Sequence, residues 1–177
     1  MEATMKKLIT ILALLCAATF SFAQKAGDKV TFTSKDMNGT AITSEIFAKN
    51  KITMVNIWGT FCPPCIKEMP DLAKLNEANK SKGVEVVGIP IDIVDRMGNI
   101  LPKPKADGEE IIAKTGTNYT HVVPSKDMMS GLLRNIQAVP ATLFVDKDGK
   151  IIGQVYLGAR SQKDWQKIID DLLAKQK

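Results

Sequence analysis

Cys62 and Cys65 lie two residues apart in the stretch WGTFCPPCIKEMP, and no other residues of this chain are as well suited to chemistry. The third cysteine of the chain, Cys16, falls in an apolar stretch near the N-terminus. A Cys-x-x-Cys pair between a strand and a helix is typical of a thiol–disulfide redox couple. In such a couple one thiolate attacks a partner disulfide, and the second thiol resolves the mixed disulfide.

Two other roles for the pair remain open at this stage. A zinc site needs about four ligands, mostly Cys and His, and apart from Cys16 the chain offers two cysteines and one histidine, His121. A purely structural disulfide would close a loop of a few residues, which constrains the unfolded chain little. The redox role is therefore favoured, and we expect no metal and no cofactor.

The two residues between the cysteines indicate how the helix begins. With Cys62 as the N-cap, Pro63 and Pro64 occupy the first two helical positions, where a missing N–H does no harm. The amide of Cys65 is then free to donate to the Cys62 sulfur, and the helix dipole favours a thiolate there. We expect Cys62 to be the exposed nucleophile and Cys65 the resolving thiol.

The cysteines stand between two segments with the composition of buried strands. Residues Ile52–Trp58 and Val84–Ile91 are nearly continuous apolar runs, typical of parallel strands covered on both faces. From Pro63 to about Lys82 apolar residues recur at helical spacing, and Gly83 ends this pattern. Two parallel strands joined by a helix are expected to form a right-handed crossover.

The remaining segments complete an α/β fold with a central mixed β-sheet and helices on both faces. The expected elements are two short strands around Asn38-Gly39 within Val30–Thr43, an irregular connection at Asp92–Gly108, a short helix at Glu109–Lys114, a strand at Tyr119–Val123, a helix at Asp127–Ile136, a hairpin around Asp146–Gly149 and a final helix capped by Ser161.

The N-terminal stretch has the pattern of a secretory signal peptide. Lys6 and Lys7 precede an eleven-residue apolar run, and a small-x-small site predicts cleavage after Ala23. This leaves a single domain at residues 24–177 and an exported, periplasmic or extracytoplasmic protein. Lipid anchoring at Cys16 is a minor alternative, because Leu15 stands where processing requires a small residue. Met5 is an alternative start.

The charge of the chain argues against nucleic acid as a partner. The formal net charge is +5, and it falls to about +4 once the signal segment is removed. No run of five basic residues and no alternation of basic and aromatic residues occurs. A mildly basic, solvated surface accounts for this composition.

The segment NIWGTFCPPCIKEMPDL resembles the TlpA/ResA-type branch of the thioredoxin superfamily, and VPATLFVDKDGKI resembles that superfamily's cis-proline loop and hairpin. The pattern W-x-x-x-C-x-x-C-x-x-E-x-P, which Trp58 opens, is more specific than the cysteine pair alone. The resemblance implies a thioredoxin-like fold with an N-terminal β extension. It also implies a cis Val139–Pro140 bond facing the cysteines, and a kink at Pro70.

Three further residues follow from this resemblance. Glu68 stands where related proteins carry an acidic residue that tunes cysteine protonation; the alternative is an ordinary exposed helix glutamate. Asn56 replaces the buried aspartate of many thioredoxins and cannot exchange a proton, which increases the importance of Glu68. Phe61 stands where a tryptophan usually precedes the first cysteine. A role for His121 as a proton shuttle has weak support, because one strand histidine is commonly structural.

The uncharged Pro-Pro dipeptide favours a reductant over an oxidant, because it adds nothing that stabilises the thiolate. The expected partners are exported client proteins with disulfides, apocytochrome c among them, and a membrane protein that delivers electrons. Alternatives are a disulfide oxidant or isomerase, a thiol peroxidase and a non-enzymatic binding module. The peroxidase motif is absent, since Val55 and Gly59 occupy its Pro and Thr/Ser places. The sequence leaves the oligomeric state open.

The connection Ile93–Ala106 is the last candidate functional segment. It leaves the sheet at the carboxyl end of a parallel strand, where sites form in open α/β sheets. Ile100 and Leu101, flanked by Pro102 and Pro104, could offer a stiff apolar patch to a client or donor. The alternative is a solvated insertion without a role.

Overall fold

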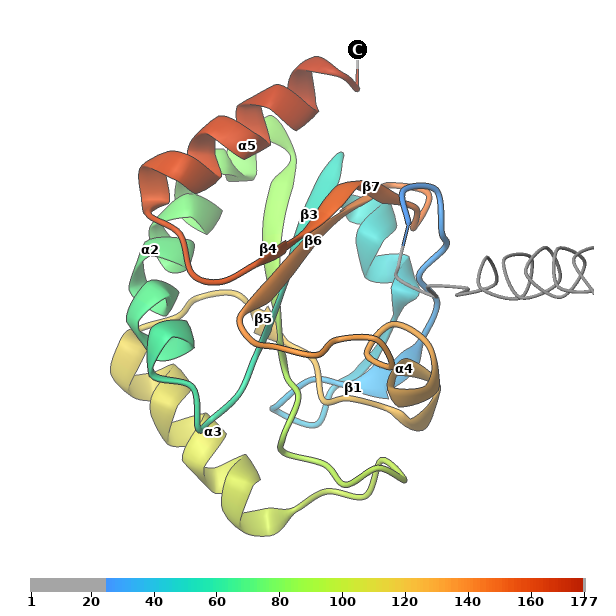
Figure 1. Ribbon diagram of the computed structural model, residues 1–177, viewed down its shortest axis with the longest axis vertical. Helices are drawn as coiled ribbons and strands as arrows, with labels where there is room; N and C mark the ends of the chain where they lie inside the picture. The colour runs from blue at the N-terminus through green and yellow to red at the C-terminus, as the bar shows by residue number, and fades with distance from the viewer. Residues whose placement is uncertain (1–24, 177) are drawn as a thin grey trace, which may run out of the picture.

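The computed structural model describes residues 25–176, so the predicted signal peptide and Cys16 lie outside the described residues. A five-stranded sheet forms the centre of the domain, in the order β5-β4-β3-β6-β7 (Figure 1). Its strands are β3 (Ile52–Trp58), β4 (Val84–Pro90), β5 (Thr120–His121), β6 (Ala141–Asp146) and β7 (Ile151–Leu157). β3 pairs in parallel with β4 and antiparallel with β6, which confirms the predicted mixed sheet.

Helices cover both faces of this sheet (Figure 1). On one face lie α2 (Pro63–Asn79), α3 (Pro102–Thr115) and α5 (Gln162–Ala174); on the other lie the 3-10 helix η1 (Ser44–Lys49) and α4 (Lys126–Ser130). The alternation of β3 explains both layers, because successive strand residues point to opposite faces. Ile52 and Met54 pack with the α2 and α5 side chains, whereas Val55 and Ile57 pack in the opposite core.

A two-stranded extension precedes the main sheet. β1 (Thr33–Lys35) and β2 (Ala41–Thr43) pair antiparallel around the predicted turn, in which Gly39 has a φ of 88°. The β6–β7 hairpin is likewise present, and its turn is closed by the Asp146 carboxylate, which accepts the amide of Asp148 at 2.9 Å. Both hairpins were predicted from their turn residues.

Two predicted boundaries are wrong. α3 begins at Pro102, so the second half of the predicted irregular connection is helical and the helix is longer than Glu109–Lys114. The prolines lie in the first turn of α3, where they are tolerated, and their presence led to the loop assignment. α4 ends at Ser130, well before Ile136. The predicted end of the cysteine helix is confirmed: α2 runs to Asn79, continues as the short 3-10 helix η2 (Lys80–Lys82) and stops at Gly83.

The remaining loop, residues 93–101, is ordered by its own hydrogen bonds. The Asp95 carboxylate accepts the amides of Met97 and Asn99 at 2.8 and 2.9 Å, and Val94 forms a β-bridge with Ile100.

Within residues 25–176 no helix combines the length and apolar character needed to cross a membrane.

Candidate active site

Cys62 and Cys65 form a disulfide at the start of α2, with their Cα atoms 5.3 Å apart. Cys62 is the N-cap, prolines follow at the first helical positions, and the Cys65 amide donates to the Cys62 sulfur at 3.3 Å. The predicted helix start is thereby confirmed. The expected exposure of Cys62 is wrong in degree: Cys62 is 5% exposed and Cys65 fully buried.

The end of β4 holds the turn that leads into the cysteine helix. The Thr60 amide donates to the Asp92 carboxylate at 3.0 Å, and the Thr60 hydroxyl contacts the same group. The Ile91 amide donates to the Trp58 carbonyl at 2.8 Å. The strand pairing of β3 and β4 is therefore continued beyond the strands, so that the turn carrying Cys62 is fixed to the sheet edge.

The Val139–Pro140 bond is cis, as the resemblance implies. Val139 packs against a buried cluster that contains both cysteines, Trp58 and Met69. The Pro140 carbonyl accepts the amide of Gly158 at 2.9 Å. The loop before β6 therefore contacts the disulfide cluster through Val139 and is hydrogen-bonded through Pro140 to Gly158, which follows β7.

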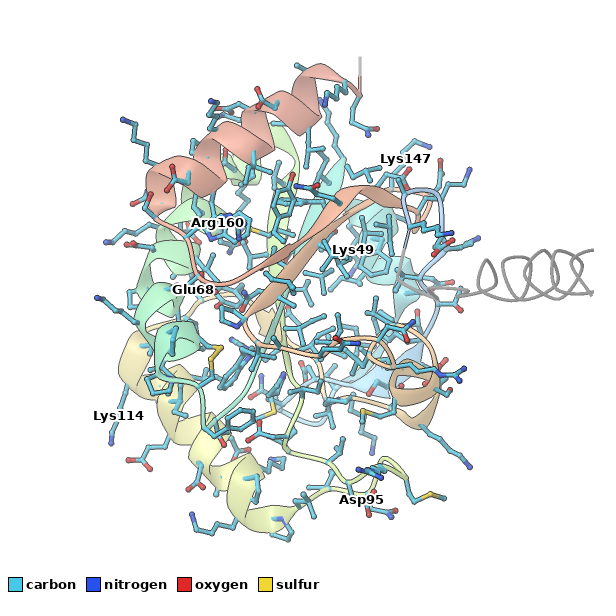
Figure 2. The ribbon with its side chains drawn as sticks, viewed as in Figure 1. Lys49, Glu68, Asp95, Lys114, Lys147 and Arg160 are labelled. Carbon is cyan, nitrogen blue, oxygen red and sulfur yellow. A yellow bond between two sulfur atoms is a disulfide. The ribbon has the colours of Figure 1, made fainter. Side chains whose placement is uncertain are left out.

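Glu68 lies one helical turn after Cys65 and is buried, at 4% exposure, which excludes an ordinary surface glutamate. Its Oε1 accepts the Asn56 amide nitrogen at 3.1 Å, and its Oε2 accepts the backbone amide of Arg160 at 3.2 Å. Figure 2 shows Glu68 and Arg160 labelled next to each other beside α2, with the yellow disulfide bond nearer the start of the helix. The carboxyl group is therefore held by two donors from distant parts of the chain.

Burial raises the pKa of Glu68 above the ordinary glutamate value, because a charged carboxylate loses its water. The hydrogen bonds from the Arg160 amide and from Asn56 act in the opposite direction, as does the Arg160 charge. The balance leaves a carboxyl group that accepts a proton at a higher pH than an exposed glutamate, within one helical turn of Cys65.

Asn56 belongs to a polar row that crosses the sheet beneath α2. Strand register places Thr142, Asn56, Gly88 and His121 side by side on β6, β3, β4 and β5. The Asn56 amide nitrogen donates to both Glu68 and the Thr142 hydroxyl, each at 3.1 Å. Asn56 cannot exchange a proton, but it orients the carboxyl group that can.

His121 is tied to Trp58 rather than to a sulfur. The Trp58 indole nitrogen donates to His121 Nδ1 at 3.3 Å, so the ring proton lies on Nε2, which faces the Thr117 hydroxyl at 3.3 Å. Burial lowers the pKa of His121 to about 4. A neutral ring with both nitrogens occupied fits a positioning role for Trp58 better than a proton shuttle.

An aromatic ring lies on the surface next to the disulfide, because Phe61, directly before Cys62, is 68% exposed. Pro70 lies inside α2, which continues through it to Asn79.

Among residues 25–176 no group of three or more His, Cys, Asp or Glu side chains is arranged to hold a metal ion.

Sequence reasoning missed Arg160 and the Gly88–His121 contact. Arg160 follows a predicted hairpin and lies outside every motif, and its role depends on a backbone amide, which every residue but proline has. Gly88 is one residue of an apolar strand, and the sequence does not show which side chain fills the space above it. Both depend on long-range strand register.

Comparison with known proteins agrees with this geometry. A family model described as Redoxin matches residues 25–170. The chain belongs to the Redoxin family. The thiol-disulfide oxidoreductase ResA of Bacillus thuringiensis subsp. konkukian is 30% identical to this redoxin over 166 residues, covering 83% of the chain and 84% of the relative. The ResA of Geobacillus kaustophilus is 25% identical, and the match covers 70% of this redoxin and 64% of the relative's length.

Solved structures share the fold of this redoxin. A thiol:disulfide interchange protein from Chlorobium tepidum superimposes with a TM-score of 0.67 at 22% identity, covering 84% of this chain and 97% of that one. One from Bacteroides sp. gives 0.64 at 25% identity, covering 83% and 90%. The family, the relatives and the Cys62–Cys65 disulfide together make this redoxin a thioredoxin-like thiol-disulfide oxidoreductase.

Proposed function

We propose that this redoxin works outside the cytoplasm as a reductant of disulfides in other exported proteins. The observation that carries the proposal is the environment of the Cys62 sulfur. It accepts the Cys65 amide, whereas the residues between the cysteines, Pro63 and Pro64, add neither a charge nor a further N–H. A thiolate with little stabilisation makes the reduced form less favourable, which lowers the reduction potential.

Glu68 supports the same direction of electron flow. A buried carboxyl group one helical turn from Cys65 opposes a negative charge on the sulfurs whenever it is itself ionised. Strong oxidants need a stabilised thiolate. A sequence that places an acid beneath the pair and prolines within it therefore favours the reductant.

The proposed cycle uses the two sulfurs in turn. The Cys62 thiolate attacks a client disulfide, forming a mixed disulfide and releasing one client thiolate, which takes up a proton. Cys65 loses its proton and attacks the Cys62 sulfur, which releases the second client thiol and leaves the Cys62–Cys65 disulfide. Two electrons have passed to the client, and a membrane electron-delivery protein restores the dithiol.

The reduction potential of the pair tests this proposal. Equilibration with a thiol–disulfide buffer of known potential, read by mass after alkylation, should give a value near that of thioredoxin, about −270 mV. A value near about −120 mV, typical of a strong oxidant, would instead assign the protein to disulfide formation or isomerisation.

Export rests on the N-terminal pattern and has its own test. If residues 1–23 are removed as a signal peptide, the protein recovered from an extracytoplasmic fraction should begin at Gln24 by mass spectrometry. A lipid-modified Cys16 at the new N-terminus would indicate anchoring instead. Apocytochrome c, with its paired haem-attachment cysteines, is the client we would test first, as a purified disulfide-bonded protein.

A further inference from the structure

The connection between β7 and α5, residues 158–161, touches the active site at two points. The amide of Gly158 donates to the carbonyl of Pro140 at 2.9 Å, and the amide of Arg160 donates to the Glu68 carboxyl at 3.2 Å. The same short segment thus holds the cis-proline loop and the buried acid.

The Arg160 side chain holds this connection through hydrogen bonds to its backbone and through contacts with two aromatic rings. Its Nη1 donates to the carbonyls of Leu157 and Gly158 at 3.1 and 2.9 Å. Its guanidinium lies over two aromatic rings, 5.1 Å from the centroid of Tyr156 and 5.0 Å from that of Trp165. Arginine suits this arrangement because its planar group can stack on rings and donate in a fixed fork at the same time.

The connection has few other constraints of its own. Leu157, Gly158 and Ala159 are exposed, and Gly158 adopts a φ of 80°, which favours glycine and leaves the backbone free to move. After Arg160 the chain is fixed again, because the Ser161 hydroxyl caps α5 by accepting the amide of Asp164 at 3.2 Å. The guanidinium therefore holds residues 157–160, which lie between the end of β7 and the cap of α5.

We propose that Arg160 is a positioning residue for the redox reaction: by clamping the β7–α5 connection it holds its own amide against Glu68, and so sets the proton affinity of the acid that lies beneath Cys65. The proposal rests on the proposed redox function. Arg160 acts through Glu68 and touches neither sulfur in this scheme, so its effect on the thiols should vanish when Glu68 cannot ionise.

The groups that face Glu68 define what else contributes. Asn56 donates to Glu68 from β3, and the Trp165 indole also favours the charged form of Glu68. Among residues 25–176 the Trp165 indole nitrogen has no hydrogen-bond partner. Tyr119, ahead of β5, is a buried neutral phenol whose pKa is raised by burial and by the Glu68 charge. Among these groups Arg160 is the cation, and it supplies both a positive charge and a backbone amide.

The first test measures the Glu68 carboxyl group directly, by carbon NMR titration of the oxidised protein, in which the cysteines do not titrate. Arg160→Met should raise the Glu68 pKa by about one unit, a tenfold gain in proton affinity. Arg160→Lys, which keeps the charge and loses the planar fork, should give part of that rise. Lys163→Met, an exposed charge change in the first turn of α5, is the matched control and should give none.

The second test asks whether Arg160 acts through the acid. In the reduced protein, Arg160→Met should shift the pH profile of cysteine alkylation, and the same substitution in a Glu68→Gln background should leave that profile unchanged. An unshifted Glu68 titration in Arg160→Met would overturn the proposal, and so would an equal alkylation shift in both backgrounds. If Arg160→Met does not fold, Arg160→Lys decides by the same two readouts.

The two tests also separate this inference from the proposed function. A reduction potential typical of an oxidant would remove the reductant role and leave the carboxyl titration fully informative. Conversely, a normal reductant in which Arg160→Met leaves Glu68 unchanged would keep the function and refute the positioning role. The titration needs no client, no electron donor and no turnover.

Discussion

Gly88 is the residue at which a single methyl group should do the greatest damage to the polar row beneath α2. A Cβ added there would lie 2.3 Å from Nδ1 and 2.6 Å from Cε1 of His121. The ring cannot easily withdraw, because it is buried, stacks on Tyr119 at 4.7 Å and accepts the Trp58 indole N–H. Gly88→Ala must therefore displace the ring and break that hydrogen bond.

Two costs add up in this variant. Overpacking a core of this kind costs about 1–3 kcal/mol, and leaving the Trp58 N–H buried without a partner costs roughly 1–3 kcal/mol more. A total of about 4 kcal/mol corresponds to a fall in Tm of roughly 8–16 °C for a domain of this size. The loss is a large share of typical stability, about 5–15 kcal/mol.

Denaturant unfolding of the oxidised protein, followed by circular dichroism, measures this effect. Gly59→Ala is the matched control: its Cβ would lie 2.7 Å from the Phe61 ring, but that ring is 68% exposed and can swing away. In a double-mutant cycle, removing the ring by His121→Ala should relieve the clash, so that the double variant is more stable than additivity predicts. Equal losses at Gly88 and Gly59, or strict additivity with His121→Ala, would refute this account.

Four further outcomes are expected. Cys65→Ala should accumulate a mixed disulfide with a client while Cys62→Ala accumulates little, as seen on non-reducing gels; faster alkylation of Cys65 than of Cys62 would reverse their roles. Glu68→Gln should lower the pH at which the thiols react with an alkylating probe, because the carboxylate disfavours thiolate; an unchanged curve would contradict the coupling. Because the pKa of Glu68 is raised in the folded protein, the stability that comes from protonating this carboxyl group is fully present below the ordinary value of 4.5 and is lost as pH rises through the folded pKa. The free energy of unfolding of the oxidised wild type, relative to that of Glu68→Gln, should therefore fall as pH rises through this range; a difference that stays constant would count against the raised pKa. Met97→Ser with Ile100→Ser, at side chains 62% and 51% exposed, should slow exchange with a protein client and leave reactivity toward a small disulfide intact; equal effects on both substrates would exclude recognition by this loop.

The sequence was most informative where local chemistry decides the structure. The start of α2 follows from the position of Pro63 and Pro64 in the first turn, and both hairpins follow from their turn residues. The same reasoning failed at α3, because Pro102 and Pro104 occur both in irregular loops and in the first turn of helices. Composition alone does not distinguish these two uses.

The part of the site that depends on strand register was beyond reach of the sequence. Glu68 and Asn56 were candidates, but their hydrogen bond joins a helix to a strand, and Thr142 completes it from across the sheet. The link from Arg160 to Glu68 spans 92 residues of chain. Its signal in the sequence is a lone arginine after a hairpin, a pattern shared by many surface arginines.

The wide spacing of these contacts has a consequence for how the protein acquires its reactivity. The cysteine helix is built from neighbouring residues, but Val139 contacts its cysteines from the loop before β6, and the amides that hold Pro140 and Glu68 come from Gly158 and Arg160, after β7. A chain interrupted before Gly158 would keep the complete cysteine motif and lack the amides that hold Pro140 and Glu68. The part of the thiol chemistry that depends on Pro140 and Glu68 is therefore a property of the finished chain, and a molecule clipped before Gly158 would carry the cysteine pair without it.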